Sequence, residues 1–394
     1  KSTLKGGADN DLVSISGSIS SSAVFGSKGN DTVEIKASGT DSVFANASVY
    51  GSNAVGTLTG NDSIYVTGVS AVNSTILGDA GNDTLIFLAT NSLNVQQGLQ
   101  IDGSAGNDSI RFSGALSEST ISGGAGADTL IATSGFAGTD SLAGGEGADT
   151  FSIRPAASAA DITVGALNAS SASVASGFET LDMRSATGDG AAATDFTVDL
   201  DHMSGVTAIS MRTADTDTKA VFTLNDLSAA QAGALTMLHT GTDADTDSEI
   251  VLDMKTDTTA DTATITATTS AATQVVEVND ANNNIENLVL TVNGDMNNTV
   301  DLDDASFATS ITISGGAASR TMTIFGDSTA LDGFTAATID LSGVASNTTL
   351  ELEGAEQTFK GGSGRDTLTV NATLSAGDVL DGGAGATDTL SMQQ

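Results

Sequence analysis

The sequence predicts an all-β protein whose chain winds into stacked parallel coils. Three observations lead to this fold class: a glycine-aspartate phrase recurs about every 20 residues, most other segments alternate apolar and polar residues, and Pro155 is the only proline among 394 residues. Alternation with period two is typical of strands with one buried face. A fixed short period indicates a solenoid, and a protein rich in strand ladders has little use for a residue that lacks an N–H group.

The repeated phrase is a glycine, a variable residue and an aspartate, followed by Ser or Thr and an apolar residue. Its aspartates lie at positions 11, 31, 62, 83, 108, 128 and 149, which gives intervals of 20, 31, 21, 25, 20 and 21 residues. In the first copy Asp9 replaces the glycine and Leu12 replaces the Ser or Thr. The two longer intervals indicate insertions before Asp62 and Asp108, where we expect the ladder of coils to bend or break. One copy would be as compatible with a simple β-turn, but seven copies at this period favour a repeat. Each coil is predicted to hold two short strands and two turns, with the motif in one of the turns.

The distribution of the motif divides the chain into three predicted parts. Residues 1–154 are predicted to form a parallel β-roll, and residues 155–355 a Thr/Ala/Asp-rich all-β region that lacks the motif and is either an extended β-solenoid or a β-sandwich. The motif returns in residues 356–394, which we interpret as a second, incomplete β-roll. Residues 227–235 form the one helical pattern, with Asn225 or Asp226 as the expected N-cap.

The residue types of the motif fit a hard cation. Glycines allow positive φ angles and leave backbone carbonyls accessible, and aspartate adds an anionic oxygen, so together they offer the six to eight oxygen ligands that calcium prefers. Two carboxylates stacked about 4.8 Å apart repel by roughly 3 kcal/mol at an effective dielectric constant near 20. We therefore predict Ca²⁺ as the cofactor and a fold that loosens without it.

The composition limits the possible partners. The chain has 49 acidic and 13 basic residues, a formal charge of −36 and no cysteine, which argues against nucleic acid as a partner. No apolar run is long enough to cross a bilayer, so we expect no membrane insertion. The two histidines form no His-Glu-x-x-His pattern and no Gly-x-Ser-x-Gly occurs, so we expect no enzyme activity.

Three segments, residues 123–130, 144–151 and 361–368, resemble the glycine-rich nonapeptide of RTX calcium-binding repeats, Gly-Gly-x-Gly-x-Asp-x-apolar-x. The resemblance implies ions that lie between turns of successive coils, held by aspartate carboxylates and carbonyls of the glycine turn. On this chain it implies the following metal-binding residues: Asp11, Gly29, Asp31, Asp62, Gly81, Asp83, Gly106, Asp108, Gly124, Gly126, Asp128, Gly145, Gly147, Asp149, Gly362, Gly364, Asp366 and Asp388.

The alternation of motif-bearing parts with a Thr- and Ala-rich body is most similar to bacterial surface-layer (S-layer) proteins. That resemblance implies an extracellular structural protein of the cell surface, secreted by a type I route, which forms a homo-oligomeric lattice or filament and has a cell-surface polysaccharide as a further candidate partner. Three alternatives stay open: a calcium-dependent adhesin or extracellular matrix protein, the repeat region of a larger secreted enzyme or toxin, and a phage fibre.

Overall fold

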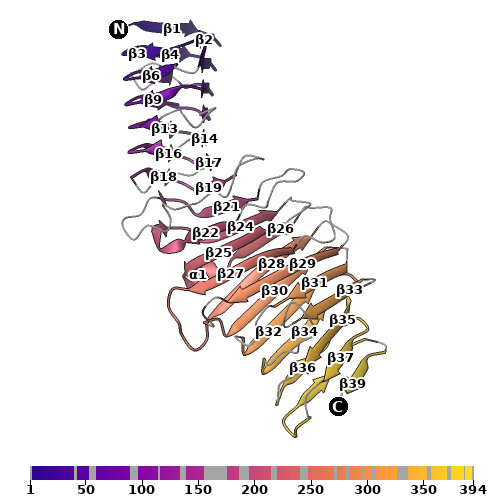
Figure 1. The fold of residues 1–394 in the computed structure, drawn as a ribbon. Helices are drawn as coiled ribbons and strands as arrows, with labels where there is room; N and C mark the ends of the chain where they lie inside the picture. Colours follow the sequence, from indigo (N-terminus) through magenta and orange to yellow (C-terminus); the bar gives the residue numbers. More distant parts are fainter. Residues whose placement is uncertain are drawn as a thin grey trace. The chain divides into compact units, whose positions relative to one another are not determined.

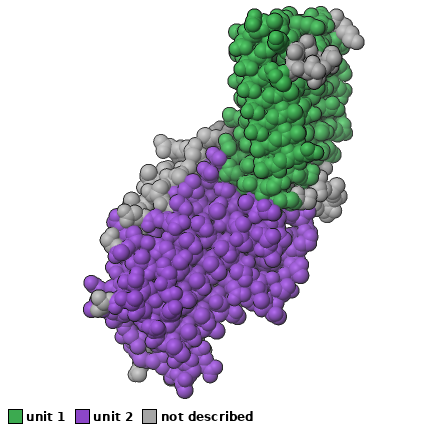
Figure 2. Space-filling view, turned by 180° about the vertical axis from the view of Figure 1, so that it is seen from behind, with its two compact units in different colours: residues 1–183, 202–206 green, residues 184–201, 207–394 purple. Residues whose placement is uncertain are grey.

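The computed structural model describes most of the chain as parallel β-structure. The described residues are 2–39, 42–52, 59–88, 96–113, 116–133, 139–154, 175–185, 195–213, 220–239, 247–269, 273–280, 282, 284–294, 297–302, 308–318, 320–325, 336–352, 356–370, 374–385 and 387–392. They form two compact units (Figure 2): unit 1 contains Lys1–Met183 and His202–Val206, and unit 2 contains Arg184–Asp201 and Thr207–Gln394. The predicted boundary at residue 154 falls beside residues 155–174, which lie outside the described part, and the three predicted domain limits remain predictions.

Unit 1 is a parallel solenoid whose described strands form three sheets, which we call A, B and C (Figure 1). Sheet A contains β1 (Thr3–Ala8), β4 (Ala23–Lys28), β7 (Ser48–Ser52), β10 (Thr75–Leu77), β13 (Gln100–Ala105), β16 (Thr120–Ala125), β18 (Ser141–Glu146), β20 (Ala175–Ser176) and β23 (Met203–Ser204). Sheet B contains β2 (Leu12–Ser16), β5 (Thr32–Lys36), β8 (Ser63–Thr67), β11 (Thr84–Leu88), β14 (Ser109–Ser113), β17 (Thr129–Ala132), β19 (Thr150–Ile153) and β21 (Thr180–Arg184). Sheet C contains β3 (Ile19–Ser20), β6 (Val43–Ala45), β9 (Ser70–Val72), β12 (Gln96–Gln97) and β15 (Leu116–Ser117).

The core of unit 1 is built from rows of apolar side chains in register. Along sheet B, Ile64 pairs with Leu85, Leu85 with Ile110 and Ile110 with Leu130, and these four side chains are at most 1% exposed. Side chains between them on each strand face outward, as a period of two requires. The parallel β-roll predicted from the sequence is therefore confirmed.

Two details of unit 1 differ from the prediction. Sheet C adds a third strand to five coils where two strands were expected. Its strands are only two or three residues long, too short to leave an alternating pattern in the sequence. The ladder also does not break at the insertions: β5 pairs with β8 over five residues in spite of the 31-residue interval before Asp62.

The described strands of unit 2 also stack in parallel, in two sheets that we call D and E (Figure 1). Sheet D contains β24 (Ala208–Thr213), β26 (Leu235–His239), β28 (Thr262–Thr269), β30 (Asn287–Asn293), β32 (Ser310–Gly315), β34 (Thr338–Val344), β36 (Thr358–Lys360) and β38 (Val379–Asp381). Sheet E contains β22 (Phe196–Asp199), β25 (Ala220–Leu227), β27 (Asp247–Met254), β29 (Thr273–Asp280), β31 (Asn297–Asp301), β33 (Thr321–Phe325), β35 (Asn347–Leu352), β37 (Thr367–Val370) and β39 (Thr389–Met392). Of the two architectures left open for the middle region, the structure is the solenoid.

A short helix lies in the connection between β25 and β26. The expected N-cap at Asn225 or Asp226 was wrong, because both residues belong to β25; α1 spans Ala229–Ala232 and is capped by Ser228. The side chains of Ser228 and Gln231 bond each other's backbone N–H groups in a capping box. A 3₁₀ turn, η1 (Leu200–His202), follows β22.

Candidate metal centre

The motif turns of unit 1 all lie at the same edge of the solenoid. Each turn leaves a strand of sheet A and enters a strand of sheet B, as Gly106-Asn107-Asp108 does between β13 and β14. Gly106 has a φ of 138°, and its N–H donates to the carbonyl of Ala125 in the next coil at 2.8 Å. Because successive coils are in register, the last residue of every turn falls above the last residue of the turn before it.

The motif aspartates form one unbroken hydrogen-bonded column. In every step, the backbone N–H of one aspartate donates to Oδ1 of the aspartate in the next coil. The steps are Asp11 to Asp31 (2.8 Å), Asp31 to Asp62 (2.7 Å), Asp62 to Asp83 (2.7 Å), Asp83 to Asp108 (2.7 Å), Asp108 to Asp128 (2.7 Å) and Asp128 to Asp149 (2.8 Å). The column passes both insertions without a gap, so of the bend or break expected before Asp62 and Asp108, a break is wrong.

The second carboxylate oxygen of each column residue is buried and has no hydrogen-bond donor. This holds for Oδ2 of Asp11, Asp31, Asp62, Asp83, Asp108, Asp128 and Asp149. Asp83, Asp128 and Asp149 are each only 1% exposed. A buried anionic oxygen without a partner costs free energy, and a repeated series of them indicates a ligand that binds oxygen.

The first glycine of each turn borders that oxygen. A Cβ atom on Gly103 would lie 2.4 Å from Oδ2 of Asp108 and 2.4 Å from the carbonyl oxygen of Gly123 in the next coil. A Cβ atom on Gly123 would lie 2.6 Å from Oδ2 of Asp128 and 2.5 Å from the carbonyl oxygen of Gly144. Two acceptor oxygens thus border one small space that any side chain would fill, and they would supply two of the six to eight oxygen ligands that Ca²⁺ takes.

The later glycines of the turn allow the backbones of neighbouring coils to approach each other. A Cβ atom on Gly81, Gly106, Gly126 or Gly147 would lie within 1.9 Å of the carbonyl oxygen of the corresponding glycine in the preceding coil. Gly29 meets the Asp9 carbonyl in the same way, and Gly124 and Gly145 meet the carbonyls of Ser104 and Gly124. Because these glycines also have positive φ angles, other residues would be strained there.

Burial perturbs the acidity of the column. It raises the pKa of Asp83 to about 7 and the pKa values of Asp62 and Asp108 to about 6, against an ordinary value of 3.8. Hydrogen bonds from backbone N–H groups lower these pKa values, and the charge of neighbouring aspartates raises them further. Burial likewise raises the pKa of Asp31, Asp128 and Asp149. A bound cation would offset the cost of holding these groups ionised.

A second ladder, which the sequence analysis did not assign, runs beside the aspartates. The side chain of Asn10 accepts from the N–H of Asn30, and the same bond links Asn30 to Asn61, Asn61 to Asn82, Asn82 to Asn107 and Asn107 to Ala127, at 2.8–2.9 Å. Each Asn side chain of this ladder accepts from a backbone N–H of the following coil, whereas each aspartate side chain of the column accepts from a backbone N–H of the preceding coil. The sequence feature that could have predicted this ladder is the recurrent Asn of Gly-Asn-Asp, at a position that the motif leaves variable.

The column ends in unit 1 at Glu179, a residue the sequence analysis also missed. The N–H of Asp149 donates to Oε2 of Glu179 at 2.7 Å. Glu179 precedes β21 as the aspartates precede their strands, so the longer side chain occupies the position of the next aspartate. Its identity as glutamate hid it from a search for Gly-x-Asp.

The motif of unit 2 is arranged differently. Its turns leave sheet D and enter sheet E: Gly362 and Gly364 follow β36, and Asp366 precedes β37. The N–H of Asp366 donates to Oδ1 of Asp388 at 3.0 Å, so the structure brings these two predicted residues together. Both oxygens of Asp366 accept hydrogen bonds, however, Oδ1 from Thr348 and Oδ2 from the N–H of Gly362. Asp366 therefore lacks the unpartnered oxygen that marks the unit 1 column.

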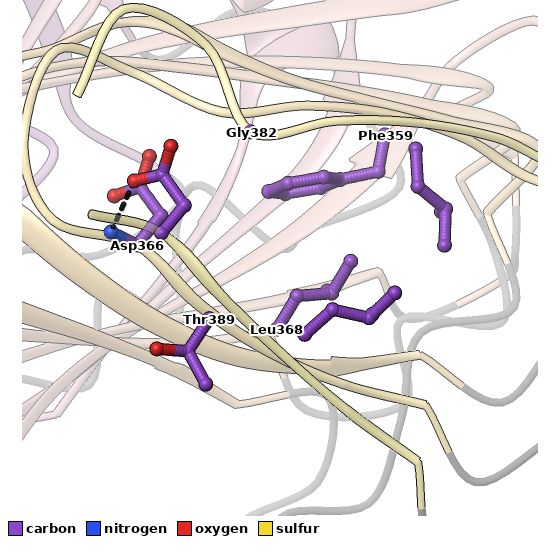
Figure 3. Close-up of a pocket in the computed structure, with 8 residues that line it drawn as sticks. Phe359, Asp366, Leu368, Gly382 and Thr389 are labelled. Atoms are coloured by element: carbon purple, nitrogen blue, oxygen red, sulfur yellow. Dashed lines mark hydrogen bonds between the residues drawn. The ribbon is translucent and has the colours of Figure 1, made fainter. Parts of the chain in front are cut away.

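A cavity of about 150 Å³ lies beside this pair. Figure 3 shows Asp366 on one side of it and Phe359 on the other. Leu368, Leu380 and Leu390 add apolar groups beside the carboxylates of Asp366 and Asp388. A Cβ atom on Gly361 would lie 2.3 Å from the carbonyl oxygen of Gly382 and 2.7 Å from Oδ2 of Asp366, so two acceptor oxygens meet here as they do in unit 1. The metal-binding roles of Asp366 and Asp388 remain predictions.

The fold and these turns define a calcium-binding parallel β-solenoid, with Asp Oδ2 of one coil and the first-glycine carbonyl of the next as the atoms that would hold the ion. Within the described residues, no three carboxylates or histidines converge on one point, so backbone carbonyls are needed to complete each site. The ligand role of each single residue remains a prediction.

Comparison with family models gives the repeat its identity. Residues 72–89, 103–136 and 134–152 match the RTX calcium-binding nonapeptide repeat, a model of four copies. The chain therefore carries RTX repeats that bind Ca²⁺, and repeats of this kind are typical of extracellular proteins secreted by the type I route. Comparisons with curated proteins and with solved structures found no match. In the described part of the chain, no helix is long and apolar enough to span a membrane.

Proposed function

We propose that this chain is a calcium-dependent structural protein of the bacterial cell surface that assembles with copies of itself into a lattice or filament. The observation that carries the proposal is the column of seven aspartates in unit 1, each with one buried oxygen that has no hydrogen-bond partner. Without a cation the column is a row of buried like charges, and with Ca²⁺ it becomes a series of bridges between coils. Calcium then decides whether the coils of unit 1 are rigidly stacked.

The charge of the chain supports assembly that responds to calcium. At a formal charge of −36, copies repel one another in the absence of a divalent cation. Calcium lowers this repulsion at the same time as it orders the coils. The two events are thus triggered by one signal.

The calcium dependence also supports a site of action outside the cell. Extracellular calcium modules bind with dissociation constants on the order of 10⁻⁴ to 10⁻³ M, far above the free calcium concentration of a cytoplasm. A chain with such sites would stay loosely folded during export and fold afterwards. We propose that the protein is a scaffold and not a catalyst, because both units consist of regularly stacked coils.

A calcium titration monitored by circular dichroism and light scattering tests the proposal. We expect β-structure to increase and particles larger than a monomer to form in millimolar calcium, with reversal by chelator. Asp128→Asn should shift both changes to higher calcium. Asp257→Asn, which removes the same charge from an exposed position, should leave them in place.

Each other outcome supports a different protein class. A chain that folds with calcium but stays monomeric contradicts self-assembly, and binding of that monomer to a cell-surface polysaccharide would identify an adhesin or matrix protein. Unchanged β-content between calcium and chelator would refute calcium-dependent folding itself. A catalytic domain next to this segment in the complete gene would identify the repeat region of an enzyme or toxin.

A further inference from the structure

Two aspartates outside the column, Asp79 and Asp102, lie beside its middle. Asp79 follows the first glycine of its turn, Gly78, and adopts a φ of 73°. Asp102 precedes the first glycine of the next turn, Gly103, and pairs in register with Leu77. The two side chains therefore belong to adjacent coils, on the side of the turn where the first glycines lie.

Both carboxylates are held in place by the backbone. Asp79 accepts a hydrogen bond from the N–H of Ser52 at 3.0 Å, and Asp102 accepts one from the N–H of Ser104 at 2.9 Å. Both residues are half-buried, and neither forms an ion pair with any residue of the described part. Two fixed negative charges are thus left without a positive partner.

These charges reach the column. Asp79 is close enough to Asp62 and Asp83 for its charge to act on them, and to Asp102 as well. Asp102 acts in the same way on Asp108 and Asp128. The three turns that end at Asp62, Asp83 and Asp108, here called the central turns, therefore lie in the most negative part of the column.

The other coils have no acidic residue at these two positions. The position of Asp79 is occupied by Gly7, Ser27, Ser52, Ser104, Gly124 and Gly145 in the other turns. The position of Asp102 is occupied by Lys5, Phe25, Tyr50, Leu77, Ser122 and Ala143. The added negative charge is therefore confined to the middle of the column, and it is not a feature that every copy of the motif shares.

A separate observation indicates a cation at this place. The Oδ2 atoms of Asp62, Asp83 and Asp108 are unpartnered, and the three residues are only 1–2% exposed. A Cβ atom on Gly51, Gly78 or Gly103 would lie 2.4 Å from the Oδ2 atom of its own turn. These buried oxygens border the spaces next to which Asp79 and Asp102 place their charges.

We propose that Asp79 and Asp102 strengthen the cation sites of the central turns, so that these turns bind Ca²⁺ first and the order of the column spreads from them toward both ends. This inference rests on the proposed calcium-dependent folding. Calcium affinity in oxygen sites rises with the negative charge of the site. The central turns have the carboxylates of Asp79 and Asp102 in addition to the column aspartates, and the other turns have no such pair. Because no three carboxylates converge among the residues that the structure describes, the two aspartates act through their charge on sites completed by backbone oxygens.

The positions of the tyrosines provide a local reporter. The chain has two tyrosines and no tryptophan, and both tyrosines flank the first of the central turns: Tyr50 directly precedes Gly51, and Tyr65 belongs to β8, which begins after Asp62. Terbium ions, which substitute for calcium, emit when a nearby tyrosine is excited, and this transfer falls steeply with distance. Terbium emission therefore reports filling of the turn that ends at Asp62 and of the turns on either side of it, whereas calorimetry with calcium counts all sites.

The experiment is a terbium titration of the full chain and two double variants. We expect wild-type emission to rise with the first ion bound per molecule. Asp79→Asn with Asp102→Asn should raise the half-saturating concentration for emission by about fivefold. The control is Asp9→Asn with Glu146→Gln, which removes the same two charges from exposed positions in outer turns, and Asp9 has a φ of 74° that matches Asp79. The control should change the half-saturation less than twofold.

Two results would overturn the inference: emission that lags behind total binding, or a control variant that shifts as far as the central one. Either would leave calcium-dependent folding intact, because circular dichroism would still change with calcium. A wild-type chain that binds neither terbium nor calcium would instead refute the proposed function. Should the central variant fold poorly, emission normalised to ions bound by calorimetry keeps the comparison valid.

Discussion

Each aspartate of the column has two separate tasks, one for each carboxylate oxygen. Oδ1 of Asp128 accepts the N–H of Asp108 and so joins two coils directly. Oδ2 of Asp128 has no donor and lies next to Gly123, close to the carbonyl of Gly144. The first task needs an acceptor, which asparagine also offers, and the second needs a negative charge. Substitution can therefore separate the hydrogen bond from the metal site.

We predict that Asp128→Asn and Asp128→Ala differ in stability in the absence of calcium, and that both gain less stability from calcium than the wild type. In chelator, the asparagine variant should be at least as stable as the wild type, because it keeps the bond to Asp108 and removes a buried charge. The alanine variant should lose about 1–3 kcal/mol, because it leaves the N–H of Asp108 buried without an acceptor. Both variants should gain less stability from calcium than the wild type does. Urea denaturation with and without calcium measures all three chains, and an asparagine variant with an undiminished calcium gain would contradict the ligand role.

The raised pKa values predict how the calcium-free protein responds to pH. Asp83 has a folded-state pKa of about 7, and Asp62 and Asp108 about 6, all above the ordinary 3.8. The folded state therefore binds more protons than the unfolded state between about pH 4 and 7. Stability falls as pH rises wherever the folded state binds more protons, so in chelator the melting temperature should be higher at pH 5 than at pH 8.

The net negative charge of the chain also lowers stability as pH rises, so a control must separate its effect from that of the column. Measurements at high salt screen exposed charges more than buried ones, and the difference between pH 5 and pH 8 should persist there. Asp83→Asn should reduce it. With calcium present the direction should reverse below pH 7, because protons compete with the ion for the same oxygens. A pH response that disappears in high salt would show that the column is not its source.

At the scale of the turn, glycine is required by the contact between coils. Gly147 has a φ of 138°, and a Cβ atom there would lie 1.7 Å from the carbonyl oxygen of Gly126. We predict that Gly147→Ala destabilises the protein by at least about 2 kcal/mol, because strain and overpacking each cost about 1–3 kcal/mol. Gly39→Ala is the matched control, since a Cβ atom on Gly39 would meet nothing within 4 Å. It should stay within about 0.5 kcal/mol of the wild type. Equal effects of the two changes in chemical denaturation would contradict the close stacking of the turns.

The strand order and the turn chemistry of unit 1 were predictable from the sequence, because one residue type recurs at one place in every coil. The unbroken column at Asp62 was not, because an interval of 31 residues does not reveal where in the coil the extra residues lie. The cap at Ser228 was missed because β25 continues through Asn225 and Asp226. Asp226 adopts a φ of 57°, and the pairing register shifts between Leu224 and Leu227, an irregularity that the helical pattern concealed. Glu179 was missed because a position in a column is defined by register, which is visible only when coils are aligned in space.

At the scale of the whole molecule, the two units depend on different interactions. In unit 2, Ile265 pairs with Leu290 and Leu290 with Ile313, in a row that is at most 1% exposed. A carboxylate step occurs there too, where the N–H of Asp261 donates to Glu286 at 2.8 Å. Asp261 itself accepts hydrogen bonds on both oxygens from Thr258, so this step is complete within the protein. Unit 2 should therefore hold its coils together without a metal.

We predict that removal of calcium raises hydrogen exchange in unit 1 and leaves the middle of unit 2 unchanged. Amides of β11, β14 and β17 should lose protection in chelator, because repulsion along the column opposes the stacking of those strands. Amides of β28 and β30 should keep it, because buried apolar rows and satisfied side chains hold them. Hydrogen exchange followed by mass spectrometry resolves these segments. In calcium, the Asp128→Asn variant should show a partial loss of amide protection that is confined to unit 1. Equal loss of protection in both units would mean that calcium acts on the chain as a whole, and that the column does not set the stability of unit 1 separately. Unequal loss would locate the calcium response in unit 1, where the aspartates have their unpartnered oxygens.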